Sequence, residues 1–181
     1  ALCYPGAGDY IYAVRGGHTV TAWRYSISGN TWSAISGVPF IIHDKTDFEY
    51  PGAGSYIYLA GYDNRHCHFA RYDINGGAWD MLEPLPRETN SGTSMMTVTA
   101  DTLYFCSSTL QVWRYDIASG TWDDTLDTQW NVVDSTRFGN IVYAGGYAYL
   151  FYGGHLAPDN HAWAFNLSSG RWDKLVKVPF Y

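Results

Sequence analysis

Charged residues are scarce in this sequence, and basic residues are the scarcer kind. Asp, Glu, Lys and Arg together make up 15% of the 181 residues, with 11 basic side chains against 17 acidic ones and a net charge of −6. Proteins that bind a nucleic-acid backbone do so mainly through clustered lysines and arginines. The composition therefore excludes nucleic acid as an expected partner.

Long apolar runs and cysteines are also lacking. Gly, Asn, Ser and Thr interrupt every uncharged stretch well before the roughly 18 apolar residues that a membrane span needs, so no membrane span is expected. The sequence starts at Ala1 with no basic and apolar leader, so we expect a targeting segment to be absent or already removed. Three cysteines are too few, and odd in number, for a disulfide framework, and they leave the redox compartment open.

Aromatic residues and glycine, by contrast, are abundant. Tyr, Trp and Phe supply 18% of the chain, hydrophobic residues 46%, and there are 19 glycines. Such a composition excludes a disordered chain and indicates a packed core. The length is that of one domain, and we expect residues 1–181 to form it.

The chain consists of four repeats. Four ten-residue segments align without gaps, and each ends in tryptophan: residues 23–32, 70–79, 113–122 and 163–172. Each is preceded by a related block rich in tyrosine and aliphatic residues, at 9–14, 55–60, 101–106 and 146–151. Successive terminal tryptophans lie 47, 43 and 50 residues apart. The four repeats span about 1–38, 47–86, 93–127 and 138–178.

Each repeat predicts four short strands, A to D. In the first two copies we expect strand A at 1–4 and 47–50, strand B at 10–15 and 56–60, and strand C at 22–27 and 69–74, followed by strand D with the repeated tryptophan. About 45 residues and four strands per repeat, with periodic glycine and aromatic residues, are typical of a β-propeller blade. The expected fold is an all-β β-propeller of four four-stranded blades, either closed alone or part of a larger ring or assembly.

The spacing of the aromatic residues resembles that of the kelch repeat family. Kelch repeats carry a double glycine after strand B, then an aromatic residue, six further residues and a tryptophan. The double glycine is present as Gly16-Gly17 and Gly153-Gly154 and is replaced in copies two and three. The resemblance covers nearly the whole chain and implies four kelch-like blades, whereas propellers of this kind have many unrelated functions. The aromatic–tryptophan pairs are Tyr25 and Trp32, Tyr72 and Trp79, Tyr115 and Trp122, and Phe165 and Trp172.

The repeated residues are expected to be structural. Blades stack face to face, so we predict that the four aromatic–tryptophan pairs lie in the core between blades. Alternation along strand C points Arg24, Arg71 and Arg114 the other way, where we expect contacts between blades, paired with carboxylates or stacked on aromatic rings. The polar residues that begin the C–D turn are expected to bond the turn backbone. They are Ser26, Asp73, Asp116 and Asn166.

Functional residues are expected at one rim of the propeller. The A–B and C–D turns share one end of an up-and-down blade, here named the hairpin rim, and the B–C and D–A connections share the other, the loop rim. The loop-rim segments are long and differ in every copy, as functional loops on a rigid scaffold do. All six histidines fall on or beside this rim. They are His18, His43, His66, His68, His155 and His161.

Three interpretations of these histidines compete: ordinary loop hydrogen bonds, polar contacts to a ligand, and a metal site. The candidate ligand-binding residues are His18, Asp63, Asn64, Arg65, His66, His68, His155, Asp159, Asn160 and His161. The candidate metal ligands are His66, Cys67, His68 and His161. His66 and His68 would point to the same side of a strand, but no second cluster at a recognised ligand spacing accompanies them.

No sequence motif identifies an enzyme, a phosphate-binding loop or a cofactor. We therefore expect a non-catalytic recognition or assembly module without a cofactor, which binds a protein or glycan partner through the loop rim. One alternative is a propeller enzyme with a His/Asp site, metal-dependent or not, at the same rim. Another is a repeat subunit of an extracellular fibre or surface layer that associates with itself. Low lysine and high tyrosine, asparagine and glycine favour a secreted or cell-surface location.

Overall fold

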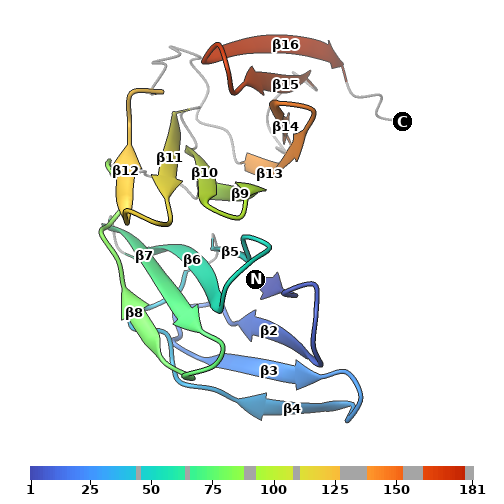
Figure 1. Cartoon of the computed structure of the whole chain (residues 1–181), viewed down its shortest axis with the longest axis vertical. Helices are drawn as coiled ribbons and strands as arrows, with labels where there is room; N and C mark the ends of the chain where they lie inside the picture. The colour runs from blue at the N-terminus through green and yellow to red at the C-terminus, as the bar shows by residue number, and fades with distance from the viewer. Residues whose placement is uncertain are drawn as a thin grey trace.

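The computed structural model describes residues 1–43, 46–63, 66–87, 93–107, 111–126, 138–152 and 161–177. These residues form four antiparallel four-stranded sheets and contain no helix (Figure 1). Accordingly, none of the described segments is a helix able to cross a membrane. Within each sheet the strands follow one another in chain order, which is the up-and-down topology of a propeller blade. The chain is an all-β β-propeller with four blades.

The strands agree closely with the repeat. Blade 1 comprises β1 (Leu2–Cys3), β2 (Tyr10–Val14), β3 (Ala22–Ser26) and β4 (Thr31–Ala34). Blade 2 comprises β5 (Asp47–Glu49), β6 (Tyr56–Asp63), β7 (His66–Asp73) and β8 (Trp79–Met81). Blade 3 comprises β9 (Thr93–Thr99), β10 (Thr102–Ser107), β11 (Val112–Asp116) and β12 (Thr121–Asp123). Blade 4 comprises β13 (Phe138–Ala144), β14 (Tyr147–Tyr152), β15 (His161–Asn166) and β16 (Arg171–Lys177).

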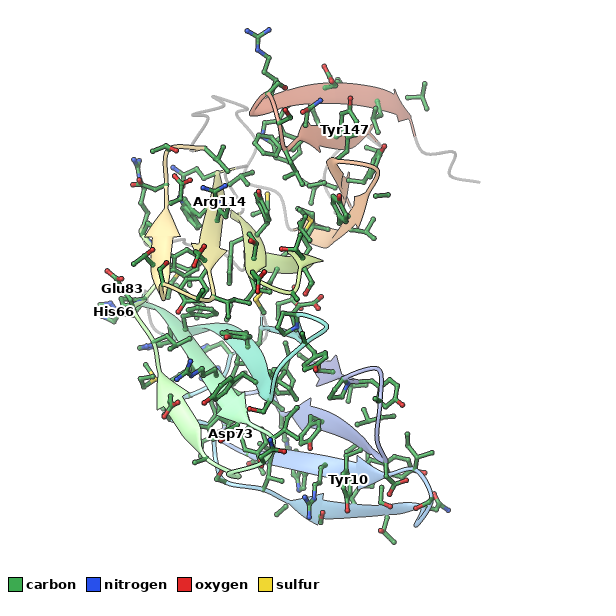
Figure 2. All side chains as sticks on the ribbon, in the orientation of Figure 1. Tyr10, His66, Asp73, Glu83, Arg114 and Tyr147 are labelled. Atoms are coloured by element: carbon green, nitrogen blue, oxygen red, sulfur yellow. The ribbon has the colours of Figure 1, made fainter. Side chains whose placement is uncertain are left out.

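The four blades lie side by side in an open arc (Figure 1). The first strand of each blade faces the inside of the arc and the fourth lies at its outer edge, with β5 and β13 each beside β9. Blades 1 and 4 are at opposite ends of the arc, as the labelled Tyr10 and Tyr147 show (Figure 2). Figure 2 also separates the two rims, because His66 and Asp73 mark opposite ends of β7.

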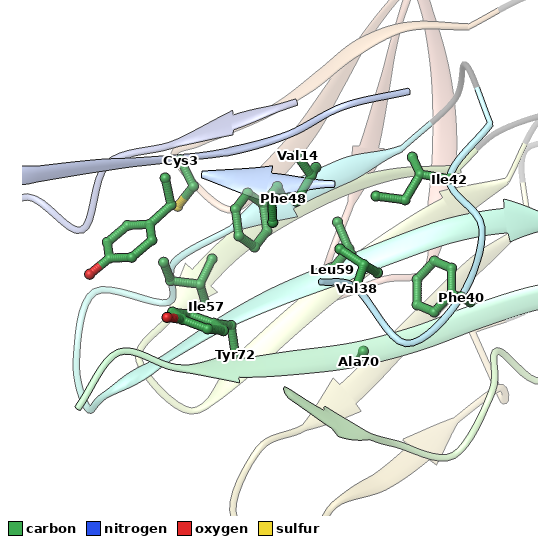
Figure 3. Close-up of a cluster of buried hydrophobic side chains, with 12 residues drawn as sticks. Cys3, Val14, Val38, Phe40, Ile42, Phe48, Ile57, Leu59, Ala70 and Tyr72 are labelled. Atoms are coloured by element: carbon green, nitrogen blue, oxygen red, sulfur yellow. The ribbon is translucent and has the colours of Figure 1, made fainter. Parts of the chain in front are cut away.

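Alternation along the strands gives each blade two apolar faces, which pack against the neighbouring blades. In the cluster between blades 1 and 2, the rings of Tyr12 and Tyr72 are 5.7 Å apart between centroids. Ile57 and Leu59 of blade 2 are buried in the same cluster (Figure 3). Equivalent clusters join blade 2 to blade 3 and blade 3 to blade 4. Burial of apolar area on this scale is the main force that holds successive sheets together.

The repeated tryptophans connect each blade to the one before it. The indole N–H of Trp79 donates to the carbonyl oxygen of Ser36 at 2.9 Å, and that of Trp122 donates to the carbonyl oxygen of Glu83 at 3.1 Å. Trp172 is buried in the cluster between blades 3 and 4. The expectation that Trp32 lies in the core is wrong: it is 57% exposed, because no sheet packs on that face of blade 1.

The repeated arginines pair with carboxylates or stack on aromatic rings as predicted. The charge of Arg24 acts on Tyr72 of blade 2 and that of Arg71 on Tyr115 of blade 3, as expected for contacts between blades, but their direct partners lie in their own blade. Arg71 pairs with Asp80 at 3.1 Å and stacks over the ring of Tyr56, and both partners belong to its own blade. Arg114 and Asp123 form the same pair in blade 3, at 2.6 Å. These ion pairs join neighbouring strands within one blade, because strand D places a carboxylate directly opposite the strand C arginine.

The C–D turns are built as predicted. Oδ1 of Asp73 accepts a hydrogen bond from the N–H of Asn75 at 3.0 Å, and Asn166 accepts one from Ser168 at 2.9 Å. The turn also requires a residue at positive φ, which is a glycine in blades 2, 3 and 4 and an asparagine in blade 1. The four residues are Asn30 (48°), Gly77 (70°), Gly120 (70°) and Gly170 (67°).

Candidate functional site

Four of the six histidines lie at the loop rim near the boundary between blades 1 and 2. They come from the B–C loop of blade 1, the connection between the two blades, and the start of β7. Ring contacts link them with a tyrosine and a phenylalanine. We name this set the rim cluster: His18, Phe40, His43, Tyr62, His66 and His68.

His18 is positioned by its backbone. It follows Gly17 and itself adopts φ of 63°, an uncommon value for a residue with a side chain. Its N–H donates to the carbonyl oxygen of Ile42 at 2.9 Å, and the N–H of Ile42 donates to Thr19 at 2.8 Å. These two hydrogen bonds hold the B–C loop of blade 1 against the connection to blade 2. The ring of His18 consequently lies edge-on to that of His43, with centroids 3.9 Å apart.

His68 is held by stacking on Phe40, with ring centroids 4.8 Å apart and planes inclined by 22°. Phe40 in turn covers Gly61, the residue paired with His68 across the β6–β7 hairpin. A Cβ atom at Gly61 would lie 2.5 Å from Cε2 of Phe40, closer than any side chain tolerates. The glycine therefore allows the phenylalanine to pack flat against blade 2.

The rim cluster combines a buried base with accessible rings. Phe40 and the neighbouring Ile42 are 6% and 0% exposed, whereas His18 and His66 are exposed. His43, Tyr62 and His68 are half-buried. Imidazole and phenol groups can both donate and accept hydrogen bonds, and their ring faces make apolar contacts. The arrangement therefore offers a contact surface with fixed rings, with Tyr62 near His43 at 6.3 Å between ring centroids.

The candidate metal ligands are not brought together by the described residues, which contain no group of three or more His, Cys, Asp or Glu side chains able to hold a metal ion. His68 faces blade 1, where it stacks on Phe40. Cys67 alternates to the other face and is buried in the cluster between blades 2 and 3. Burial at that position separates the thiol from both neighbouring histidines.

The remaining predicted residues are placed only in part. Asp63 pairs with His66 at the end of the β6–β7 hairpin, and His161 begins β15 opposite Lys177 in blade 4. Blade 2 lacks the double glycine, and its hairpin strands are longer here than the sequence predicts. Five predicted residues lie outside the described residues: Asn64, Arg65, His155, Asp159 and Asn160.

Three members of the rim cluster were not among the predicted ligand-binding residues: His43, which was predicted only to lie on or beside the loop rim, and Phe40 and Tyr62. The sequence did contain a signal for Phe40 and Tyr62. Phe40 is a large apolar residue in the segment between two blades, and Tyr62 stands where a kelch-like blade has its second glycine. Only the packing of the connection onto blade 2 reveals that they meet the histidines.

A second feature is a cleft of about 210 Å³ at the hairpin rim between blades 1 and 2. The A–B turns of both blades contribute to it, and in the second of these the hydroxyl of Tyr50 donates to Gly54 at 3.0 Å. Hydrogen bonds from the Ser26 hydroxyl and from the N–H of Ser28 lower the pKa of Asp9, so its carboxylate is charged at the cleft. The cleft is lined by residues that include Asp9, Tyr10, Tyr12 and Tyr50.

The inner strand β5 carries two carboxyl groups with altered acidity. Burial raises the pKa of Asp47, whose Oδ2 accepts a hydrogen bond from the N–H of Met95 at 2.7 Å. Burial, together with the nearby Asp47 carboxylate, raises the pKa of Glu49 to about 7. These groups face the inside of the arc and not the rim cluster.

Comparison with known proteins supports the fold. No family model matches the chain, and no curated protein sequence does, so membership of the kelch family is not established. A solved structure titled "Crystal structure of Nidogen/Laminin Complex" aligns with a TM-score of 0.69 and 10% sequence identity. The alignment covers 96% of this chain, which thus spans 61% of the length of that one. At this identity the likeness establishes the β-propeller architecture alone.

Proposed function

We propose that this propeller is a non-catalytic recognition module that binds a protein partner through its loop rim. The observation that carries the proposal is the rim cluster, in which histidine and tyrosine rings stand on a buried apolar base between two blades. Interfaces are enriched in aromatic side chains, and rings that are already ordered lose little conformational freedom on binding. The exposed His18 and His66 would make the first contacts.

The proposed surface extends along the loop rim beyond the rim cluster. It includes the ligand-binding residues predicted from the sequence on the B–C loops of blades 2 and 4, which are Asp63, Asn64, Arg65, His155, Asp159, Asn160 and His161. The structural neighbour is a propeller solved as a complex of two proteins, nidogen and laminin, and it supports the same use of this fold here. A secreted or cell-surface location is part of the proposal.

A glycan is the second candidate, and the cleft at the hairpin rim favours it. Three tyrosine rings and a charged carboxylate line a space of about 210 Å³, and sugars bind to such combinations of flat apolar faces and hydrogen-bond acceptors. This site lies at the opposite end of the blades from the rim cluster. Mutations can therefore distinguish the two candidates.

The test compares three variants with the wild type on a glycan array and in affinity capture from secreted proteins, followed by measurement of Kd with the purified partner. We expect His18→Ala/His66→Ala to weaken protein binding by at least about tenfold, a loss of roughly 1.4 kcal/mol. The control is Tyr4→Ala, an exposed residue at the hairpin rim, which should leave Kd unchanged.

Equal binding by the double histidine variant and the wild type would contradict the protein-binding proposal. A glycan signal that is lost in Tyr50→Ala and retained in both other variants would assign recognition to the cleft instead. Circular dichroism of every variant confirms that the sheets remain folded.

A further inference from the structure

The faces that blades present to the preceding blade are buried in every blade except the first. In blade 2 the strand B and C residues of this face, Ile57, Leu59 and Tyr72, are 0%, 0% and 3% exposed. The corresponding residues in blades 3 and 4 are buried as well. They are Leu103, Phe105, Trp113 and Tyr115 in blade 3, and Ala148, Leu150, Trp163 and Phe165 in blade 4.

The same face of blade 1 is open. Trp32 is 57% and Leu2 67% exposed, and Ile11, Trp23 and Tyr25 are half-buried. The strand pairings Leu2↔Ala13 and Tyr25↔Trp32 place these residues on one side of the sheet. Since Arg24 points to the other side, the face is apolar and carries no charge on its central strands.

Blade 4 also has an open face. It is the face that blades 1 to 3 each pack against the following blade. In blades 1 to 3 this face is centred on Tyr12, Tyr58 and Tyr104, which are 3%, 1% and 7% exposed. The equivalent residue in blade 4 is Tyr149, which is half-buried, and its neighbour across the strand pairing, Val142, is 52% exposed. Ala164 stands where blades 1 to 3 have an arginine, so the two central strands carry no charge on this face, while the exposed Asp173 lies opposite Ala164 on the outer strand.

The two open faces match as successive blades of the chain do. At the first two blade boundaries a tyrosine from the earlier blade approaches one from the later blade, with ring centroids 5.7 Å apart for Tyr12 and Tyr72 and 6.2 Å for Tyr58 and Tyr115, and Phe165 takes the later position in blade 4. By the same rule Tyr149 would meet Tyr25. In blades 2 and 3 the later blade also supplies an indole N–H that reaches a backbone carbonyl of the earlier one, which Trp32 could do on a blade 4, whereas the buried indole N–H of Trp172 has no such partner among the described residues.

We propose that two copies of this chain associate head to tail, with blade 1 of each copy stacked on blade 4 of the other. Repeat proteins bury their apolar faces only against neighbouring repeats, so both open faces gain from such a contact. Two identical contacts close the pair with two-fold symmetry and leave no open blade. The resulting ring has eight blades, within the range of about four to eight that propellers have.

The test is the mass in solution, measured by light scattering over a range of concentrations. We expect the wild type to reach twice the 20.3 kDa of one chain. Trp32→Lys and Val142→Lys each place a charge on one open face, so each variant should be a monomer at concentrations where the wild type is a dimer. Met81→Lys is the matched control: it changes an apolar residue that is 51% exposed on blade 2, away from both faces, and should remain a dimer.

Mixing the two monomeric variants tests the head-to-tail arrangement itself. Each variant retains the face that the other has lost, so one intact contact can form and the mixture should give dimers at raised concentration. A wild type that stays monomeric, a dimer that survives both substitutions, or a mixture that stays monomeric would each overturn the proposal. All three variants are altered at exposed side chains, and circular dichroism checks that they fold.

Discussion

Glu49 shows how the inside of the arc affects single residues. It lies on β5 beside Asp47, with the hydroxyl of Thr97 3.4 Å from its Oε2. Burial and the neighbouring carboxylate raise its pKa from the ordinary 4.5 to about 7. The folded protein therefore binds this proton more tightly than the unfolded chain does, so the free energy of unfolding falls as the pH rises from about 4.5 to about 7.

Replacement of Glu49 by glutamine should remove this penalty. One pKa unit corresponds to about 1.4 kcal/mol, and since the side chain retains some exposure to solvent we expect a reduced gain, about 1–2 kcal/mol, in the free energy of unfolding at pH 8. At pH 4 the variant and the wild type should be equally stable. Urea denaturation at the two pH values measures the difference.

The control is Glu83→Gln, at an exposed position on the connection after β8, which should change stability by no more than about 0.5 kcal/mol at either pH. A Glu49→Gln protein that is no more stable than the wild type at pH 8 would show that the carboxyl group is well solvated.

For single residues, the sequence predicts hydrogen bonds within a turn better than it predicts contacts between side chains on different strands. Asp73 and Asn166 bond their turn backbones as expected, because that geometry is local. The repeated arginines were expected to make contacts between blades. The charges of Arg24 and Arg71 do act on tyrosines of the next blade, but the ion pairs of Arg71 and Arg114 lie within one blade. Which strand D residue stands opposite an arginine depends on strand register, and Asp80 becomes the partner of Arg71 only once that register is fixed.

At the scale of elements, the β6–β7 hairpin connects the blade scaffold to the rim cluster. Gly61→Ala places a Cβ atom 2.5 Å from Cε2 of Phe40, so the ring must move and its stacking on His68 is lost. Overpacking of this kind costs about 1–3 kcal/mol, which thermal or urea unfolding will measure. NMR of the His68 ring should show a shift in the same variant.

A double-mutant cycle isolates the contact. Phe40→Leu leaves more room above the glycine, so Gly61→Ala should cost less in that background, with a coupling of at least about 0.5 kcal/mol between the two substitutions. Strictly additive effects would mean that Phe40 does not pack on Gly61.

Strand positions could be predicted from periodicity, whereas the rim cluster could not. The predicted strands B and C of blade 1 end within one residue of β2 and β3, because alternation and turn residues are local signals. The rim cluster depends on how the connection between blades 1 and 2 packs onto a hairpin some 20 residues further on. Histidine positions along the chain predicted that these side chains share the loop rim, and they gave no information on Phe40 or Tyr62.

At the scale of the whole molecule, four repeats give four blades, and the count follows directly from the sequence. Whether the ends of the array meet does not follow from the repeat, since every copy carries the same kind of faces. The structure shows an open arc with a tryptophan-bearing face at blade 1 (Figure 1). Trp32 has the same place in its repeat as Trp172, and only the position of its blade at the end of the arc makes it exposed.

Oxidative footprinting of the individual tryptophans in the Val142→Lys variant tests this account most directly. The account predicts that Trp32, 57% exposed, reacts much faster than the equivalent Trp172, which is 5% exposed, and than Trp113 in the centre of blade 3, which is 0% exposed. Comparable reaction of Trp32 and Trp172 would contradict a stack of four sheets in which each repeated tryptophan is covered by the blade before it.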